Sequence, residues 1–189
     1  KELNKIPDTV GVDTWGVDYV LLDENDEVIG DAYAYRDGRT KNTIPSVHKR
    51  VPFAELYKKT GIQFAQYNTV YQLYDDVRTG KIERAASYLN LPDYFHFRLT
   101  GVKKQEYTMA TTSAMVNVET HAYDTEILEK LGYKKSLFQP LTQPGAYVGE
   151  FTDETEKIVG YKAKVILPAT HDTASAVLAA PLKKQTPYI

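Results

Sequence analysis

The residues best suited to acid–base chemistry follow a short apolar run near the end of the chain. Val165-Ile166-Leu167 predicts a buried strand, and Thr170-His171-Asp172-Thr173 comes shortly after it, before a small-residue helix predicted over 174–180. A carboxylate at a helix start can point into a cleft and act as a general base. The same position is a common helix cap, where Asp172 or Thr170 would accept amide hydrogen bonds. The sequence leaves both hypotheses open.

A second polar group follows the other predicted buried strand, over residues 9–13. Asp13-Thr14-Trp15-Gly16-Val17-Asp18 places two carboxylates, a hydroxyl and the only tryptophan around one glycine. One hypothesis is a tight turn in which Gly16 takes a special backbone angle. The other is the floor of a ligand site, where Gly16 permits close approach, because clefts at the carboxyl ends of strands often bind ligands.

The tyrosine-rich segment 63–72 is a third candidate. Its aromatic rings and amides, Tyr67 among them, could stack on a sugar or form hydrogen bonds with it. Alternatively, the segment is the start of a helix that packs on the core.

Strands and helices must position these groups. Further strands are predicted over 17–22, over 27–29 after a turn at 23–26, and over 32–35. Helices are predicted where capping residues and glycines bracket apolar residues at helical spacing: between Pro52 and Gly61, from Asn68 to Gly80, over 82–89, from Pro92 to Gly101, from Asp124 to Gly132, and over 153–159 before Gly160. The pattern predicts one α/β domain with an inserted helical block and few strands.

The amino-acid composition excludes several classes of function. The 189 residues carry a net charge of −2 and no cysteine, so disulfides, zinc ribbons and cysteine nucleophiles are excluded, and a reducing cytoplasm is the expected location. Basic residues are scattered in pairs, so no nucleic-acid partner is expected. No apolar run approaches the roughly 20 residues of a membrane helix. The sequence also lacks a P-loop, a Gly-x-Gly-x-x-Gly motif, a zinc-type histidine pair and a nucleophile elbow.

Several segments, in the right order over nearly the whole chain, resemble the FGGY family of carbohydrate kinases. These segments are Gly11-Val12-Asp13-Thr14-Trp15-Gly16-Val17-Asp18, residues 34–40, residues 60–73, residues 91–101, residues 106–112 and His171-Asp172-Thr173-Ala174-Ser175-Ala176-Val177. The Leu99-Thr100-Gly101 and Asp172 elements suit any member of the family. The block from Asp13 to Asp18 is more selective, and it is similar to the members that act on L-rhamnulose.

The resemblance implies an RNase H-like (actin-like ATPase) fold, with transfer of the γ-phosphoryl group of ATP, with Mg²⁺, to the 1-hydroxyl of L-rhamnulose. Asp172 matches the family's catalytic base, and Gly16, His171 and Thr173 match its sugar contacts. Tyr67 falls where related kinases place an aromatic sugar contact. Phosphoryl transfer needs alignment, charge neutralisation and a carboxylate to take the proton, so the chemistry agrees.

The same resemblance implies that residues 1–189 are an incomplete N-terminal, sugar-binding domain. The family's opening phosphate-binding hairpin and its nucleotide-binding second domain would lie outside this sequence, so the chain alone is expected to be inactive. The strand around Val10 would then have an open edge through which copies of the chain could associate. The alternatives are another kinase of the family, such as one acting on fuculose, and a non-catalytic sugar-binding module.

Overall fold

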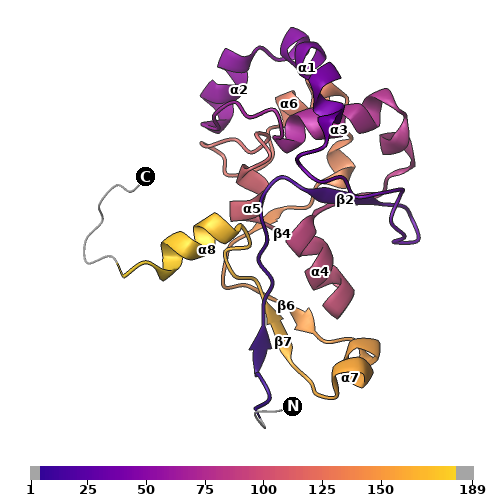
Figure 1. Ribbon diagram of the computed structural model, residues 1–189, viewed down its shortest axis with the longest axis vertical. Helices are drawn as coiled ribbons and strands as arrows, with labels where there is room; N and C mark the ends of the chain where they lie inside the picture. The colour runs from indigo at the N-terminus through magenta and orange to yellow at the C-terminus, as the bar shows by residue number, and fades with distance from the viewer. Residues whose placement is uncertain (1–4, 182–189) are drawn as a thin grey trace.

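The computed structural model describes residues 5–181 (Figure 1). Its strands are β1 (Thr9–Val10), β2 (Tyr19–Leu22), β3 (Ser87–Asn90), β4 (Gln105–Glu106), β5 (Leu141–Thr142), β6 (Tyr147–Glu150) and β7 (Lys164–Ile166). Its α-helices are α1 (Ile44–Arg50), α2 (Phe53–Thr60), α3 (Thr69–Arg78), α4 (Leu91–Thr100), α5 (Tyr107–Thr111), α6 (Thr125–Leu131), α7 (Asp153–Val159) and α8 (Asp172–Ala179). Short 3₁₀ helices are η1 (Gly38–Asn42), η2 (Lys81–Arg84) and η3 (Lys135–Leu137).

The two predicted buried strands lie side by side. β1 pairs in parallel with β7, with Thr9 opposite Lys164, and β6 pairs antiparallel with β7 on its other side. The predicted α/β class is therefore confirmed. In this sheet β1 is an edge strand within the described part of the chain, and Thr9 is exposed. Association of copies at that edge stays a prediction.

The predicted helix over 82–89 is wrong. Residues 81–84 form the single turn η2, and β3 then pairs antiparallel with β2, which joins Tyr19 to Asn90 and Leu22 to Ser87. All of β3 is buried, so pairing with β2 outweighed a local apolar spacing that also suited a helix. The predicted strand over 27–29 is reduced to a single bridge between Val28 and Leu22, and residues 32–35 form no strand.

Glycine marks the ends of the correctly predicted helices. α2, α4, α6 and α7 each end at a glycine with a positive φ, the conformation that glycine adopts with least strain. The predicted cap residues at the helix starts agree less uniformly with the structure. Asp124 caps α6 through a hydrogen bond from the Ile127 amide, whereas Asn68 stands at the cap position of α3 without such a bond. The helix α1 was not predicted.

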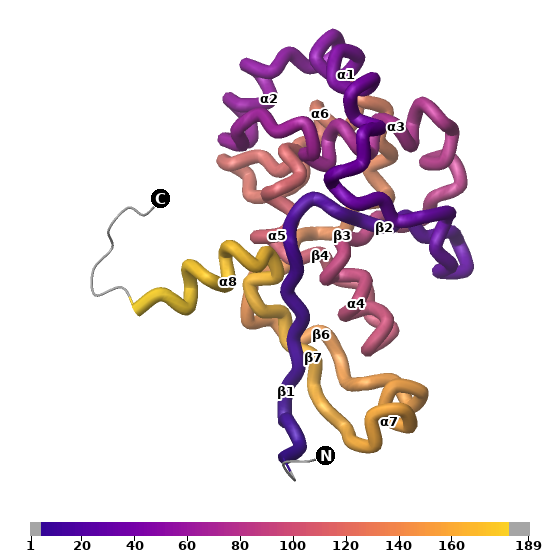
Figure 2. Tube along the Cα trace, in the orientation of Figure 1, coloured from indigo at the N-terminus to yellow at the C-terminus, as the bar shows by residue number. Residues whose placement is uncertain are grey.

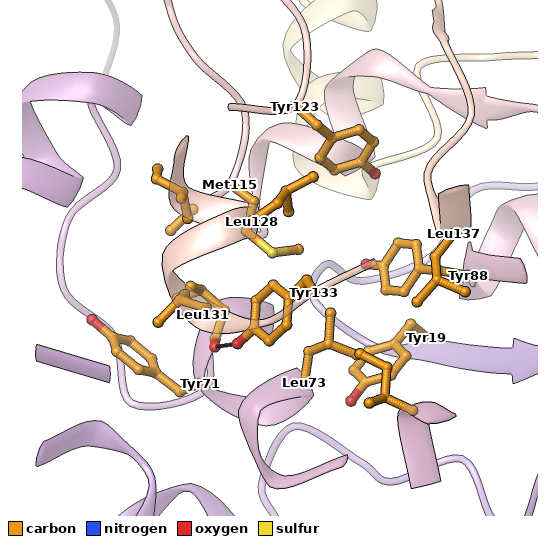
Figure 3. Packing of buried hydrophobic residues seen from close by; sticks show 14 of the residues in the cluster. Tyr19, Tyr71, Leu73, Tyr88, Met115, Tyr123, Leu128, Leu131, Tyr133 and Leu137 are labelled. Atoms are coloured by element: carbon orange, nitrogen blue, oxygen red, sulfur yellow. Dashed lines mark hydrogen bonds between the residues drawn. The ribbon is translucent and has the colours of Figure 1, made fainter. Parts of the chain in front are cut away.

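The main core lies among α1, α3, α6 and the β2–β3 pair, where tyrosines and leucines face one another (Figure 3). Leu73 and Tyr88 are fully buried, and Tyr19 lies against Tyr88 with ring centroids 5.1 Å apart. The buried hydroxyl of Tyr133 donates to the carbonyl of Val70 at 2.6 Å, so its polar end is satisfied. Of the fifteen tyrosines, five are buried core residues within the described part of the chain.

The β1–β7–β6 sheet has a much smaller core. Val148, Val165 and Leu167 are its fully buried members, and neither α7 nor α8 contains a buried residue. In Figures 1 and 2 the sheet and α7 extend below the helical part, and α8 projects to the side from their junction. Over residues 5–181, each helix is too short or too polar to cross a lipid bilayer.

Candidate functional site

The two polar groups found in the sequence meet where β1 and β7 end. The Thr14 amide donates to the carbonyl of Thr170 at 3.0 Å, and the Asp172 amide donates to the carbonyl of Thr14 at 2.9 Å. Parallel pairing thus resumes past the last paired residues of β1 and β7, at the bridge between Thr14 and His171, which is shifted by two residues from the register of those strands. The Trp15 turn and the start of α8 are therefore neighbours in space.

A buried carboxylate fixes the segment before α8. Glu106 is fully buried at the start of α5, where it accepts from the amides of Thr108 (2.8 Å) and Met109 (3.0 Å). Its Oε2 also accepts from the amide (3.2 Å) and the hydroxyl (2.7 Å) of Thr170. One side chain thus caps α5 and holds the loop that leads to Asp172. Sequence reasoning did not find this role of Glu106, because Thr170 is remote from it in sequence.

Asp172 is the first residue of α8, and its side chain is 54% exposed. Its Oδ1 accepts from the Thr173 amide at 2.6 Å and the Thr173 hydroxyl at 3.2 Å. Within residues 5–181 no partner contacts Oδ2, so this oxygen is available to a ligand.

The capping hypothesis agrees with the structure only in part, because Asp172 accepts from the Thr173 amide but does not stand at the cap position. His171 stands at the cap position of α8 and makes no side-chain capping bond, while the Thr170 hydroxyl is bound to Glu106. Nε2 of His171 lies 3.7 Å from Oδ1 of Asp172. The carboxylate therefore borders the site together with an imidazole and a hydroxyl.

The first strand end is a strained turn. The special backbone angle falls on Val17, with φ of 71°, and not on Gly16 as predicted. A positive φ is costly for a β-branched residue, so neighbours must hold it. Thr112 accepts from the Val17 amide at 3.2 Å, while Thr69 and Gln72 donate to the Val17 carbonyl at 2.8 and 3.2 Å.

Gly16 is needed for close approach. A Cβ atom at this position would lie 3.0 Å from Cγ2 of Thr112, so a side chain would displace the α5 end. Thr112 was not predicted as part of the site. Its hydroxyl accepts from the Val17 amide, and its carbonyl accepts from the Asn68 side chain at 3.1 Å.

Trp15 stands at the edge of this turn, 48% exposed, and its indole Nε1 donates to Oδ2 of Asp18 at 2.7 Å. Asp18 itself is only 4% exposed. Burial raises the pKa of the Asp18 carboxyl above its usual value, against the opposing effect of the hydrogen bond from Trp15.

The segment between α2 and α3 forms the opposite wall. The side-chain oxygen of Asn68 accepts from the Ala65 amide at 2.9 Å and shapes the turn that presents Tyr67. The Tyr67 ring lies edge-on to Tyr35 with centroids 5.5 Å apart. Gln72 donates to the Tyr67 carbonyl at 2.8 Å as well as to Val17, so one amide joins both walls.

These segments enclose one cleft of about 790 Å³. Gly16, Tyr67, His171, Asp172 and Thr173, the five residues predicted for the site, all border it. The remaining lining residues are Trp15, Val17, Tyr35, Tyr57, Gly61, Ile62, Gln63, Ala65, Asn68 and Thr112. The volume suits a small-molecule ligand, and the lining combines aromatic faces with hydroxyl, amide and carboxylate groups. The roles of the five residues stay predictions.

Over residues 5–181, no three histidine, aspartate or glutamate side chains come together in a group that could hold an ion.

Comparison with known proteins identifies the class. The family model for the N-terminal domain of the FGGY family of carbohydrate kinases matches residues 3–179. The chain therefore belongs to the FGGY family of carbohydrate kinases. Two bacterial proteins named rhamnulokinase are particularly similar: that of Halalkalibacterium halodurans is 46% identical over 185 residues, and that of Oceanobacillus iheyensis is 44% identical over 185 residues. Each alignment covers 97% of this chain but only 40% and 39% of the relative, so the chain spans about two fifths of their length.

Solved structures agree on the fold. The xylulose kinase of Rhodospirillum rubrum superposes with a TM-score of 0.87 at 19% identity, covering 97% of this chain and 39% of that one. The gluconate kinase of Lactobacillus acidophilus gives 0.81 at 23% identity, covering 88% and 35%. At these identities the likeness concerns the fold, and it confirms the predicted RNase H-like class.

Proposed function

We propose that this chain forms the N-terminal, sugar-binding domain of a kinase that transfers the γ-phosphoryl group of ATP to the 1-hydroxyl of L-rhamnulose. The observation that carries the proposal is the exposed carboxylate of Asp172 in the cleft, beside the turn at Gly16. The similarity to two proteins named rhamnulokinase supports L-rhamnulose as the substrate.

In the proposed reaction Asp172 is the general base. A sugar hydroxyl is a weak nucleophile, so Oδ2 of Asp172 accepts its proton while the hydroxyl oxygen forms a bond to the γ-phosphorus. The bond from that phosphorus to the β,γ-bridging oxygen breaks, and ADP leaves with the electron pair. Because Thr173 already binds Oδ1, the carboxylate is oriented before the sugar arrives.

The neighbours of Asp172 would bind and orient the ketose. His171 and Thr173 flank the base and offer hydrogen-bonding groups to the sugar hydroxyls. Gly16 lets the sugar approach the backbone, and Tyr67 offers an aromatic face from the opposite wall.

ATP is the proposed phosphoryl donor, and Mg²⁺ would neutralise the charge on its phosphates. Since the residues from 5 to 181 hold no suitable group of metal ligands, we assign no residue of this chain to the ion.

The test is a substrate screen with the full-length protein, ATP and Mg²⁺, in which ADP release is measured and the sugar phosphate is identified by ³¹P NMR. L-Rhamnulose is expected to give the highest kcat/KM, above L-fuculose, D-xylulose and glycerol. A higher value for L-fuculose would favour the alternative kinase. Saturable sugar binding without ADP release would favour a non-catalytic sugar-binding module.

A further inference from the structure

The side chain of Trp15 has an unusual combination of exposure and attachment. The indole borders the cleft and is 48% exposed, so the core alone does not fix it. Its one polar atom, Nε1, donates to Oδ2 of Asp18 at 2.7 Å. This hydrogen bond to a carboxylate therefore sets the orientation of the ring.

The backbone that joins the two residues is held independently. Gly16 lies against Thr112, and Val17 is kept at its positive φ by bonds to Thr112, Thr69 and Gln72. The turn thus brings the side chain of residue 18 back toward residue 15, whether or not the indole is present. Loss of the Asp18 carboxylate would release the ring and leave the turn in place.

Burial of the Asp18 carboxylate has a cost in folded-state stability. The carboxylate is 4% exposed, and its Oδ1 has no hydrogen-bond partner among residues 5–181. A buried polar atom without a partner destabilises the folded state. The nearby guanidinium of Arg39 is engaged by Gln72 at 3.0 Å and by Asp76 at 3.5 Å. The charge of Arg39 still favours the ionised carboxylate, but burial is the larger effect and raises the pKa of Asp18. The hydrogen bond to Trp15 is the contact by which this carboxylate acts on the cleft wall.

We propose that Asp18 is a positioning residue that holds the Trp15 indole as a fixed wall of the cleft, against which the carbon skeleton of the bound ketose packs. The identity of the ligand rests on the proposed function, whereas the hold of Asp18 on Trp15 does not. A wall that is already ordered lowers the entropy lost on binding, so the effect falls mainly on sugar affinity.

The first test measures, without any sugar, how firmly Asp18 holds the Trp15 side chain. In this chain Trp15 is the only tryptophan, so time-resolved emission anisotropy reports this side chain alone. Asp18→Ala is expected to enlarge the fast anisotropy decay and to increase quenching by acrylamide. Asp18→Asn, which retains an acceptor oxygen, is expected to lie between Ala and wild type. The control Asp8→Asn changes an exposed carboxylate and should match wild type.

The second test is a double-mutant cycle in the full-length protein. Asp18→Asn and Trp15→Phe are each expected to raise KM for L-rhamnulose by about tenfold, while kcat changes by less than about threefold and KM for ATP stays unchanged. Because Asp18 acts through the indole, the double variant should be no worse than Trp15→Phe alone.

The outcomes separate the two proposals. Unchanged anisotropy in a folded Asp18→Ala chain, or KM effects that multiply in the double variant, would overturn the positioning role. If Asp18→Ala does not fold, Asp18→Asn and Trp15→Phe still decide it. A full-length protein that does not phosphorylate L-rhamnulose would overturn the proposed function, while the anisotropy would still show whether Asp18 holds Trp15.

Discussion

The helical part of the molecule and the β1–β7–β6 sheet differ in how their structure is maintained. The first is built around a large core of tyrosines and leucines, whereas the second buries only Val148, Val165 and Leu167 completely. Asp172 nevertheless comes from the sheet side, and its segment is fixed by polar bonds to Glu106 from the helical side. The helical part thus holds most of the buried core, and the proposed site lies at the junction.

The largest expected effect is at the junction. Asp172→Asn in the full-length protein keeps the shape of the side chain but cannot accept the proton, so kcat for L-rhamnulose should fall by about 10²–10⁴-fold. Sugar affinity should change little. Steady-state kinetics together with calorimetric titration of the sugar would measure both, with Asp8→Asn as the exposed control. A variant that keeps most of its kcat would leave Asp172 with a structural role only.

Because the two cores differ in size, the same Leu→Ala substitution is expected to lower the free energy of unfolding by different amounts in each. Leu73→Ala, in the large core, should lower the free energy of unfolding by about 3 kcal/mol. Leu167→Ala removes the same atoms from the small sheet core, where the loosely covered surroundings can close over the gap, and should cost at least about 1 kcal/mol less. Urea unfolding would compare them. Equal losses would mean that the two parts share one core energetically.

His96 joins the two parts and makes the joint sensitive to pH. Its Nε2 accepts from the Val12 amide, just after β1, at 2.9 Å, and burial lowers its pKa to about 4. The unfolded chain therefore takes up a proton near pH 6.5 that the folded chain binds only near pH 4. Stability from this group is complete above about pH 6.5 and is lost as pH falls toward 4, by up to about 3 kcal/mol.

Urea unfolding at pH 7 and pH 4.5 would measure this loss. His96→Asn should lose less stability over that interval than wild type, and His121→Asn, at an exposed position, should behave as wild type. Burial also lowers the pKa of His48, so a remaining pH dependence is expected in both variants. An unchanged loss in His96→Asn would exclude His96 as the sensitive group.

Sequence reasoning succeeded where the signal was local. The stop glycines bounded α2, α4, α6 and α7, and the two strand ends were recognised by polar residues after apolar runs. It failed where partners are distant: β3 pairs with β2 across more than sixty residues of chain, and Glu106 reaches Thr170. Likewise, the strain at Val17 depends on Thr112, Thr69 and Gln72, which no local pattern indicates.

The central claim is that the junction of the two parts binds a ketose beside Trp15, and emission from this sole tryptophan tests it directly. Titration of the chain with L-rhamnulose should change the Trp15 emission saturably, because the sugar displaces water from the indole face. Glycerol at the same concentration should leave the emission unchanged. Equal responses to both compounds, or no response in a chain that binds L-rhamnulose by calorimetry, would contradict the placement of the sugar in this cleft.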